Sequence, residues 1–396
     1  MKTIGVVTVS RSDYGIYLPI LQKMADDPEL HLGLLVGGTH LSPKFGLTLR
    51  EIEKDGFSIE AKVETPLSSD HPEDISKAIG RGITAFASIY SYFHPDILLV
   101  LGDRYEMFSA VSAALPFKIP VAHIHGGEST EGLIDEALRH SITKMSHLHF
   151  VSTESYAQRV IQMGEEPWRV SVSGAPGLDH LNQMQIIPRR ELEKQYGFDL
   201  TPPVLLVTYH PVTLEYEDME KQLGELLSAL NEIDSGIIFT YPNADTKNQS
   251  VIDWIEKFRT QRQRTWIVPN FGTRAYLSVM NYVSAMVGNS SSGIIEAASF
   301  KLPVVNVGNR QRGRTSSKNV LHIGDDRSEI KMGIYKALSP EFRASLVGLI
   351  NPYGDGHASE RIVRKLKDIA IDDKLLLKHF YEIPNLYHAD RIYRHG

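Results

Sequence analysis

Residues 97–104 read Ile-Leu-Leu-Val-Leu-Gly-Asp-Arg, a five-residue apolar run followed by a glycine and two charged residues. Because every position of the run is apolar, it fits a strand buried on both faces. Short runs rich in Val, Ile and Leu recur along the chain, separated by stretches with helical spacing. Buried strands that alternate with helices predict a parallel sheet covered on both sides.

The strands form two successive series. The first half predicts strands at 4–9, 31–36, 57–63, 97–101, 120–124, 148–151 and 170–172, with helices near 14–26, 73–93, 104–117, 135–146 and 153–163. The second half predicts strands near 204–208, 236–240, 265–268, 284–287, 303–307 and 320–323. Two series, rather than one very wide sheet, predict an α/β fold with two Rossmann-like doubly wound domains that face a cleft.

The domain boundaries follow from the glycines and prolines between the two series. We expect an N-terminal Rossmann-like domain over 1–173 and a hinge over 174–203, with a short helix from Arg189 to Tyr196. A second Rossmann-like domain is expected over 204–350. A charged helical tail over 351–396, without strand pattern, is expected to pack back across the domains.

Composition excludes several classes of function. The chain has 396 residues, 42 Lys and Arg against 48 Asp and Glu, and a net charge of −6, so it has no general attraction for nucleic acid or anionic lipid. It has no cysteine, which excludes disulfides, iron–sulfur clusters, thiolate zinc and cysteine nucleophiles. Its longest apolar run has five residues and its first residues are too polar for a signal peptide, so we expect a cytoplasmic enzyme without membrane association.

Two groups of candidate residues follow the first and the most apolar strand. Ser10-Arg11-Ser12-Asp13-Tyr14-Gly15 opens a helix, and a helix start with an added cation suits a phosphate. The alternative is an ordinary helix cap, provided by Ser12 or Asp13. Asp103 and Arg104 follow the most apolar strand, at 97–101, and can orient a sugar hydroxyl or accept a proton. The alternative is a helix-capping Asp with a local ion pair.

A dense cluster of ionisable groups follows the strand at 120–124. It consists of His123, His125, Glu128, Asp135, Glu136, Arg139 and His140, with Gly126-Gly127 allowing a tight turn. Carboxylates and imidazoles this close can shift each other's pKa and divide acid and base roles. A His/His/Glu set can also bind a metal; however, a cleft with many arginines needs none to stabilise a leaving phosphate.

The second half carries candidate phosphate-binding residues. Gly288-Asn289-Ser290-Ser291-Ser292-Gly293 is a loop of small residues before a helix, suited to cradle a diphosphate with amides and hydroxyls. Glu296, one turn into that helix, can accept bonds from a ribose. Further candidates at strand ends are His210, Asn243, Arg310, Arg312 and Arg314.

Taken together, these motifs resemble the hydrolysing UDP-N-acetylglucosamine 2-epimerases, which supply sugars for sialic and related nonulosonic acids. The matching segments, in the family's order, are Ser-Arg-Ser-Asp-Tyr-Gly at 10–15, Leu-Gly-Asp-Arg at 101–104, His-Ile-His-Gly-Gly-Glu at 123–128, residues 135–147, His-Pro-Val-Thr at 210–213, Gly-Asn-Ser-Ser-Ser-Gly at 288–293 and residues 306–314. No single segment is decisive, whereas the ordered set is highly specific.

The resemblance implies a glycosyltransferase B-like fold and a reaction in two steps. The C2 proton and UDP are eliminated to give a 2-acetamidoglucal, and water then adds back on the opposite stereochemical course. The implied catalytic residues are Asp103, His123, His125, Glu128 and Asp135. The implied UDP or substrate contacts are Arg11, Arg104, Arg139, His210, Asn243, Phe271, Ser290, Ser291, Glu296 and Arg310. Some relatives, notably the non-hydrolysing epimerases, carry Glu at the position of His125, whose imidazole can act as acid or base.

The predicted function is hydrolysis of UDP-N-acetylglucosamine to N-acetylmannosamine and UDP, with no cofactor, no metal and a homodimer suggested by relatives. The same reaction on UDP-N,N'-diacetylbacillosamine is an alternative, because the two sugars differ only at C4 and C6. A UDP-sugar glycosyltransferase of the same architecture and a non-catalytic nucleotide-sugar sensor are alternatives of other classes. Neither needs the cluster of acid/base groups at 123–140.

Overall fold

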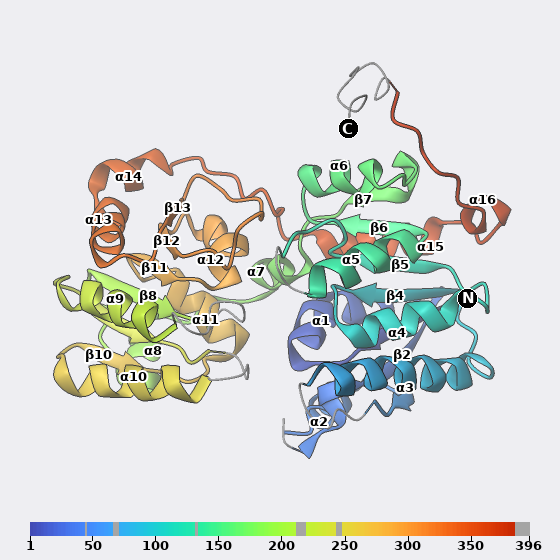
Figure 1. The fold of residues 1–396 in the computed structure, drawn as a ribbon, viewed down its shortest axis with the longest axis horizontal. Helices are drawn as coiled ribbons and strands as arrows, with labels where there is room; N and C mark the ends of the chain where they lie inside the picture. The colour runs from blue at the N-terminus through green and yellow to red at the C-terminus, as the bar shows by residue number, and fades with distance from the viewer. Residues whose placement is uncertain (44–45, 66–70, 131–133, 211–218, 243–247, 385–396) are drawn as a thin grey trace, which may run out of the picture. The chain divides into compact units, whose positions relative to one another are not determined.

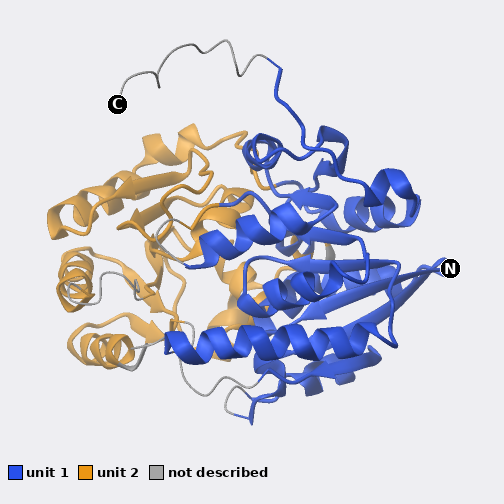
Figure 2. Ribbon diagram, turned by 45° about the vertical axis from the view of Figure 1, so that its right-hand side comes forward, with its two compact units in different colours: residues 1–128, 133–179, 354–396 blue, residues 129–132, 180–353 orange. Residues whose placement is uncertain are grey.

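The computed structural model describes residues 1–43, 46–65, 71–130, 134–210, 219–242 and 248–384. The chain divides into two compact units, which Figure 2 colours separately. Unit 1 comprises residues 1–128, 133–179 and 354–396, and unit 2 comprises residues 129–132 and 180–353. The C-terminal segment therefore belongs to the same unit as the N-terminal half.

Unit 1 is built on a seven-stranded parallel sheet with the strand order β3-β2-β1-β4-β5-β6-β7 (Figure 1). Its strands are β1 (Lys2–Thr8), β2 (Leu30–Gly37), β3 (Ile59–Val63), β4 (Ile97–Leu101), β5 (Val121–Ile124), β6 (Leu148–Val151) and β7 (Val170–Val172). Each lies within two residues of a strand expected from the apolar runs, so those predictions are confirmed.

The apolar run at 97–101 shows why this sheet is covered on both faces. Side chains alternate along a strand, and Ile97, Leu99 and Leu101 pack in one core cluster while Leu98 and Val100 pack in another. Both clusters exclude water, so an apolar side chain is favoured at every position of the strand, and the alternation of polar and apolar residues typical of half-exposed strands is missing.

Helices cover both faces of the sheet in unit 1. They are α1 (Arg11–Ala25), α2 (Leu49–Lys54), α3 (Pro72–Tyr90), α4 (Tyr105–Ala114), α5 (Ile134–Met145), α6 (Glu154–Gln162), α15 (Ala358–Asp368) and α16 (Asp373–Leu376). The short α2 has no counterpart among the predicted helices. From the tail, Ile362, Val363 and Leu366 of α15 are buried in the same core cluster as residues of α1.

Unit 2 is built on a six-stranded parallel sheet with the order β10-β9-β8-β11-β12-β13. Its strands are β8 (Val204–Thr208), β9 (Gly236–Phe239), β10 (Thr265–Ile267), β11 (Ala285–Gly288), β12 (Val304–Val307) and β13 (Val320–Ile323). Its helices are α8 (Arg189–Tyr196), α9 (Met219–Asn231), α10 (Asn248–Gln261), α11 (Gly272–Met280), α12 (Ser291–Ile295), α13 (Arg327–Leu338) and α14 (Pro340–Ser345), and α7 (Asp179–Gln183) begins at its border with unit 1. The helix expected from Arg189 to Tyr196 is confirmed.

Both sheets reverse their strand order at one point, between β1 and β4 in unit 1 and between β8 and β11 in unit 2. This pattern is that of doubly wound sheets, and it confirms the predicted fold class of two Rossmann-like domains. Ligands of such sheets bind outside the carboxyl ends of the strands at the reversal point. The motifs at 10–15, 101–104 and 288–293 follow β1, β4 and β11.

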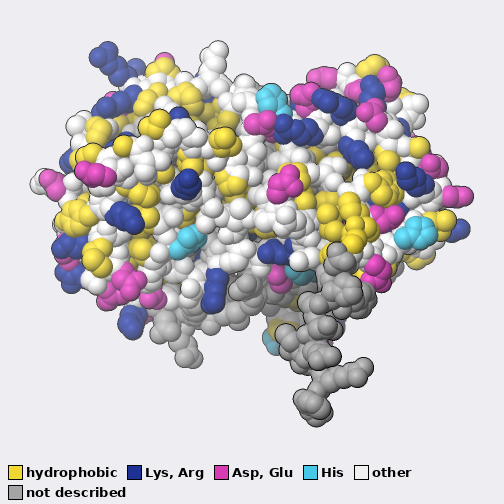
Figure 3. All heavy atoms as spheres, turned by 90° about the horizontal axis from the view of Figure 1, so that it is seen from above, with side chains coloured by type: hydrophobic (Ala, Val, Ile, Leu, Met, Phe, Trp, Pro, Cys, Tyr) yellow, Lys and Arg dark blue, Asp and Glu magenta, His cyan; other side chains and the backbone are white. Residues whose placement is uncertain are grey.

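Two further observations concern the surface. Acidic and basic side chains are intermixed over the described part of the face in Figure 3. Among the described residues, none of the helices is long and apolar enough to cross a bilayer.

Candidate functional site

In unit 1 the candidate residues follow three neighbouring strands, β1, β4 and β5. The last residues of β4 and β5 are paired in register, Leu101 with Ile124, so the segments that follow start at the same edge of the sheet. This register brings the turn at 102–104 next to the turn at 125–128.

His125 and Glu128 form a hydrogen-bonded pair. His125 Nδ1 lies 2.6 Å from Glu128 Oε1, which also accepts a bond of 2.6 Å from the Ser152 hydroxyl. Glu128 is only 5% exposed, so its carboxylate holds the imidazole in a protected environment. If Nδ1 donates to Glu128, the Nε2 atom carries the free lone pair of a neutral imidazole. This is the arrangement of a general base with an orienting carboxylate.

The backbone of this turn is shaped for the pair. His125 has a φ of 64°, a left-handed conformation that non-glycine residues seldom adopt and that is concentrated at functional sites. Gly127 has a φ of 73°, and a Cβ added there would lie 2.7 Å from the Tyr156 carbonyl oxygen. The second glycine of the motif therefore has a steric reason that is independent of any ligand.

His123 is fully buried on β5. Its Nε2 lies 2.8 Å from the Gly102 carbonyl oxygen and its Nδ1 lies 3.2 Å from the Thr143 hydroxyl. Burial lowers the pKa of His123 to about 3, so the ring is neutral at pH 7, and its Nε2 carries the proton and donates to the carbonyl. Both ring nitrogens are thus bonded to the protein, and His123 fixes the backbone next to Asp103.

Asp103 pairs with Arg139 of α5, a residue 36 positions further along the chain. Arg139 is 3% exposed, and its other guanidinium nitrogen lies 3.6 Å from Glu136 Oε2. The N-cap of α4 is Arg104, so Asp103 is not the capping residue, and its ion pair is not with the adjacent arginine. The buried guanidinium of Arg139 therefore fixes the position of the Asp103 carboxylate.

Arg104 lies among three carboxylates, Asp13, Glu106 and Asp135, of which the motifs did not indicate Glu106. Its Nε is 3.8 Å from Asp13 Oδ1, and it interacts electrostatically with Glu106 and Asp135. Asp13 and Glu106 are 6% and 2% exposed, and burial raises the pKa of each above its ordinary value while Arg104 opposes this rise. Burial also raises the pKa of the partly exposed Asp135, again against Arg104.

A signal for Glu106 is present in the sequence, because it is the only charged residue in the otherwise small and apolar stretch of α4. The capping alternative for 10–15 was wrong in its detail. Ser10 is the N-cap of α1 and its hydroxyl accepts from the Asp13 amide, so neither Ser12 nor Asp13 caps the helix. Arg11, the first residue of α1, is exposed and its Nε lies 3.4 Å from Glu51.

In unit 2 the loop after β11 contacts the end of β8. Gly288 has a φ of 129°, and a Cβ there would lie 2.0 Å from the Thr208 carbonyl oxygen, so only glycine fits. The side chain of Asn289 accepts from the His210 amide and donates to the His210 carbonyl, at 2.7 and 2.8 Å. These bonds place His210 beside the predicted phosphate loop.

Charge in this region comes from Arg310. Its Nη1 donates to the Asn289 carbonyl at 3.1 Å, and Gln311 Nε2 donates to the same oxygen at 2.8 Å. Burial, and secondly Arg310, lowers the pKa of His210 to about 3, so this imidazole is neutral at pH 7. The side chains of Arg312 and Arg314 line a separate cavity.

The remaining predicted contacts of unit 2 lie on α11 and α12. Ser290 is the N-cap of α12, Ser291 is its first residue and Glu296 is its C-cap. Phe271 is 8% exposed and packs edge-on against Tyr196, with ring centroids 4.8 Å apart. Asn243 and residues 211–213 lie outside the described residues.

Tyr276 is a further polar residue that the motifs did not indicate. Its hydroxyl interacts with the side chains of Ser290, Ser292 and Thr208, between the ends of β8 and β11, and burial raises its pKa. It belongs to none of the motifs recognised in the sequence, so the sequence offers no signal that singles it out.

Comparison with known proteins agrees with this arrangement of motifs. The family model described as UDP-N-acetylglucosamine 2-epimerase matches residues 22–367. The chain belongs to the UDP-N-acetylglucosamine 2-epimerase family.

This chain is similar in sequence to hydrolysing members of the family. It is 37% identical to the UDP-N,N'-diacetylbacillosamine 2-epimerase (hydrolyzing) of Legionella pneumophila over 379 residues, 96% of this chain and 99% of the relative. It is 36% identical to the polysialic acid biosynthesis protein P7 of Escherichia coli, over 97% of this chain and 98% of the relative. The structure of S. aureus MnaA with UDP has the same fold, with a TM-score of 0.76 and 19% identity over 93% of this chain and 96% of that one.

Proposed function

We propose that this family member converts UDP-N-acetylglucosamine to N-acetylmannosamine and UDP. The observation that carries the proposal is the His125–Glu128 pair, because it provides an oriented imidazole base beside the turn that holds Asp103. A glycosyltransferase acting at C1 has no need of a base for the C2 proton.

In the first step, His125 Nε2 removes the proton from C2 of the sugar. The C–H electrons form the C1=C2 double bond, the C1–O bond breaks, and its electrons leave with the UDP oxygen. The imidazolium that results is stabilised by the Glu128 carboxylate. The products of this step are a 2-acetamidoglucal and UDP.

In the second step, water adds across the double bond. Asp103, which Arg139 holds in place, accepts a proton from the water as the water oxygen bonds to C1. Asp135 is suited to supply a proton to C2 on the face of the sugar opposite to the one from which His125 removed it, because burial raises the pKa of its carboxyl. His123 contributes by holding the Gly102 carbonyl, and with it the turn that carries Asp103, in place.

The leaving diphosphate is proposed to bind in unit 2. Hydroxyls of Ser290 and Ser291, the neutral His210 and the guanidinium of Arg310 provide donors and one positive charge. Donors placed where negative charge develops are typically the largest source of rate enhancement in such reactions. Arg11 and Arg104 of unit 1 are proposed to neutralise further charge on the substrate, with Glu296 on the ribose and Phe271 near the base.

A second candidate substrate is UDP-N,N'-diacetylbacillosamine, which the Legionella relative's name specifies. The reacting atoms at C1 and C2 are the same, so the machinery above serves both sugars. The choice depends on contacts to C4 and C6.

The test is incubation of the full chain with each UDP-sugar in deuterated water, without an acceptor. Release of UDP with one deuterium at C2 of the free sugar is expected. The sugar that gives the higher kcat/KM is the substrate. An intact donor, or UDP release with an unlabelled C2, contradicts elimination and hydration.

A further inference from the structure

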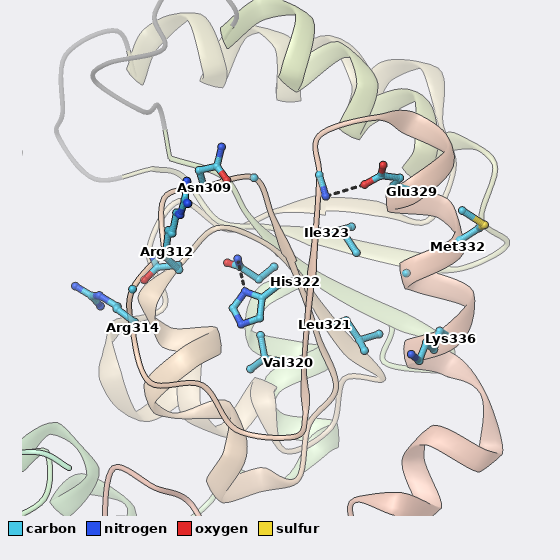
Figure 4. Close-up of a pocket in the computed structure, with 16 residues that line it drawn as sticks. Asn309, Arg312, Arg314, Val320, Leu321, His322, Ile323, Glu329, Met332 and Lys336 are labelled. Atoms are coloured by element: carbon cyan, nitrogen blue, oxygen red, sulfur yellow. Dashed lines mark hydrogen bonds between the residues drawn. The ribbon is translucent and has the colours of Figure 1, made fainter. Parts of the chain in front are cut away.

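Unit 2 contains a cavity of about 840 Å³ that the proposed reaction does not use. It lies between the loop 308–314 that follows β12, the edge strand β13 and helix α13 (Figure 4). Its lining includes neither His210 nor any residue of the phosphate loop at 288–293. This volume falls in the range of sites that hold small organic ligands.

The charged side chains around the cavity are mostly basic. Arg312 and Arg314 line it from the loop and Lys336 from α13, against one acid, Glu329. Glu329 Oε2 already accepts from the Gly324 amide at 2.9 Å. The Arg314 Nε is buried and makes no hydrogen bond within the described residues. An excess of cations suits phosphate or carboxylate groups, because the oxygens of these groups accept hydrogen bonds from arginine and lysine.

The cavity also offers neutral polar groups. Gln311 is 2% exposed, and its Oε1 has no hydrogen-bond partner within the described part of the chain. His322 lies near the centre of the view in Figure 4, and its Nδ1 is 3.2 Å from Nδ2 of the Asn306 side chain. Because burial lowers the pKa of His322, the ring is neutral, and an Nδ1 that accepts from Asn306 leaves Nε2–H as a donor.

One wall of the cavity is apolar. Leu321 and Ile323, which share one face of β13, and Met332 of α13 line it, and Met332 is 64% exposed, whereas Val320 lines the cavity from the other face of the strand, with His322. A bare inorganic anion gains nothing from such a wall, whereas the ring of an organic anion would cover it. The combination of a basic rim and an apolar wall therefore favours an organic anion.

The cavity is linked to the phosphate loop by one side chain. Gln311 lines the cavity and donates to the Asn289 carbonyl, the same oxygen that Arg310 binds. Asn289 in turn holds the backbone of His210. A ligand that moves the loop at 308–314 would therefore shift groups proposed to bind the diphosphate.

We infer that this cavity is a second ligand site, for a small ring-containing organic anion with a phosphate or carboxylate group, and that it modulates UDP binding through Gln311. The modulation rests on the proposed UDP site, whereas the binding of the anion does not. Coupling between two sites is reciprocal, so each ligand changes the affinity of the other by the same factor.

The test is calorimetric titration of the full chain, loaded with one molar equivalent of UDP, with three probes: AMP, glucuronate and inorganic phosphate. We expect AMP or glucuronate to bind at least tenfold more tightly than inorganic phosphate, and the stronger of the two identifies the anionic group. Lys336→Glu should weaken that probe at least tenfold and leave the affinity for UDP itself unchanged. Arg343→Glu makes the same charge change on exposed α14, outside the cavity, and should bind the probe like the wild type.

Absence of binding by both organic probes, equal binding of inorganic phosphate, or unchanged probe affinity in Lys336→Glu overturns the site. The coupling is measured as the UDP Kd with and without saturating probe, and a change of about fivefold or more is expected. An unchanged UDP Kd overturns the coupling alone. A chain that binds the probe without UDP present but releases no UDP from a UDP-sugar would contradict the proposed function and leave the second site intact.

Discussion

Replacing Glu128 with Gln tests whether this carboxylate orients His125 as the base. In the wild type, Glu128 Oε1 accepts from His125 Nδ1 at 2.6 Å, a bond length typical of strong, charge-assisted pairs. Gln is nearly isosteric, but its amide group can donate to Nδ1. That donation moves the imidazole proton to Nε2 and removes the lone pair that takes the C2 proton.

The expected loss combines the wrong tautomer with the loss of a carboxylate beside the developing imidazolium. In Ser-His-Asp enzymes the corresponding Asp-to-Asn change lowers kcat by about 10⁴-fold. A loss of about 10³- to 10⁴-fold in kcat is therefore expected here, which corresponds to ~4–5.5 kcal/mol of activation free energy. Because Glu128 is 5% exposed and is not among the proposed UDP contacts, UDP affinity should be unchanged.

The assay is UDP release under saturating UDP-sugar, with deuterium incorporation at C2 and the Kd of UDP measured on the same preparation. Ser152→Ala is the matched control, because it removes the other bond to Glu128 Oε1 and leaves the carboxylate. We expect it to lose no more than about tenfold, in line with one hydrogen bond to a charged group. If Glu128→Gln retains kcat within tenfold of the wild type, His125 is not the base that this reasoning requires.

Three further changes test other parts of the molecule. Asp103→Asn should abolish turnover while UDP still binds, since it removes the charge that Arg139 holds in place; near-normal turnover would show that Asp103 has another role. His210→Ala should raise the Kd of UDP with a smaller effect on kcat, measured by calorimetry and steady-state kinetics, and an unchanged Kd would contradict its place beside the phosphate loop. Glu165 is fully buried, and although burial opposes ionisation, bonds from His149, Lys144 and Lys378 lower its pKa from 4.5 to about 2. Glu165→Gln should therefore lower the free energy of unfolding at pH 7 by ~3 kcal/mol, measured by urea titration. The difference between variant and wild type should shrink as the pH falls from about 4.5 towards 2, because the wild-type carboxylate is then protonated as well. A constant difference across that pH range would refute the assignment.

The sequence determined the strands because each one carries its own signal. The run at 97–101 is apolar at every position since both faces of β4 are buried, and this can be recognised without knowing its neighbours. The same holds for Gly127 and Gly288, where the backbone approaches another segment so closely that a side chain is excluded. The ordered motifs also indicated the family, because they specify residue types at fixed places along the chain.

Only the tertiary structure decided which of these residues act on one another. Arg139, predicted as a substrate contact, lies beside Asp103 because α5 packs near the end of β4, and no local pattern encodes a contact across 36 residues. The arginines at 310, 312 and 314 read as one cluster, yet Arg310 contacts the phosphate loop while the other two line a different cavity. The physical reason is that pairing, burial and the resulting pKa values depend on distances between segments, and these are set by strand order and helix packing rather than by sequence spacing.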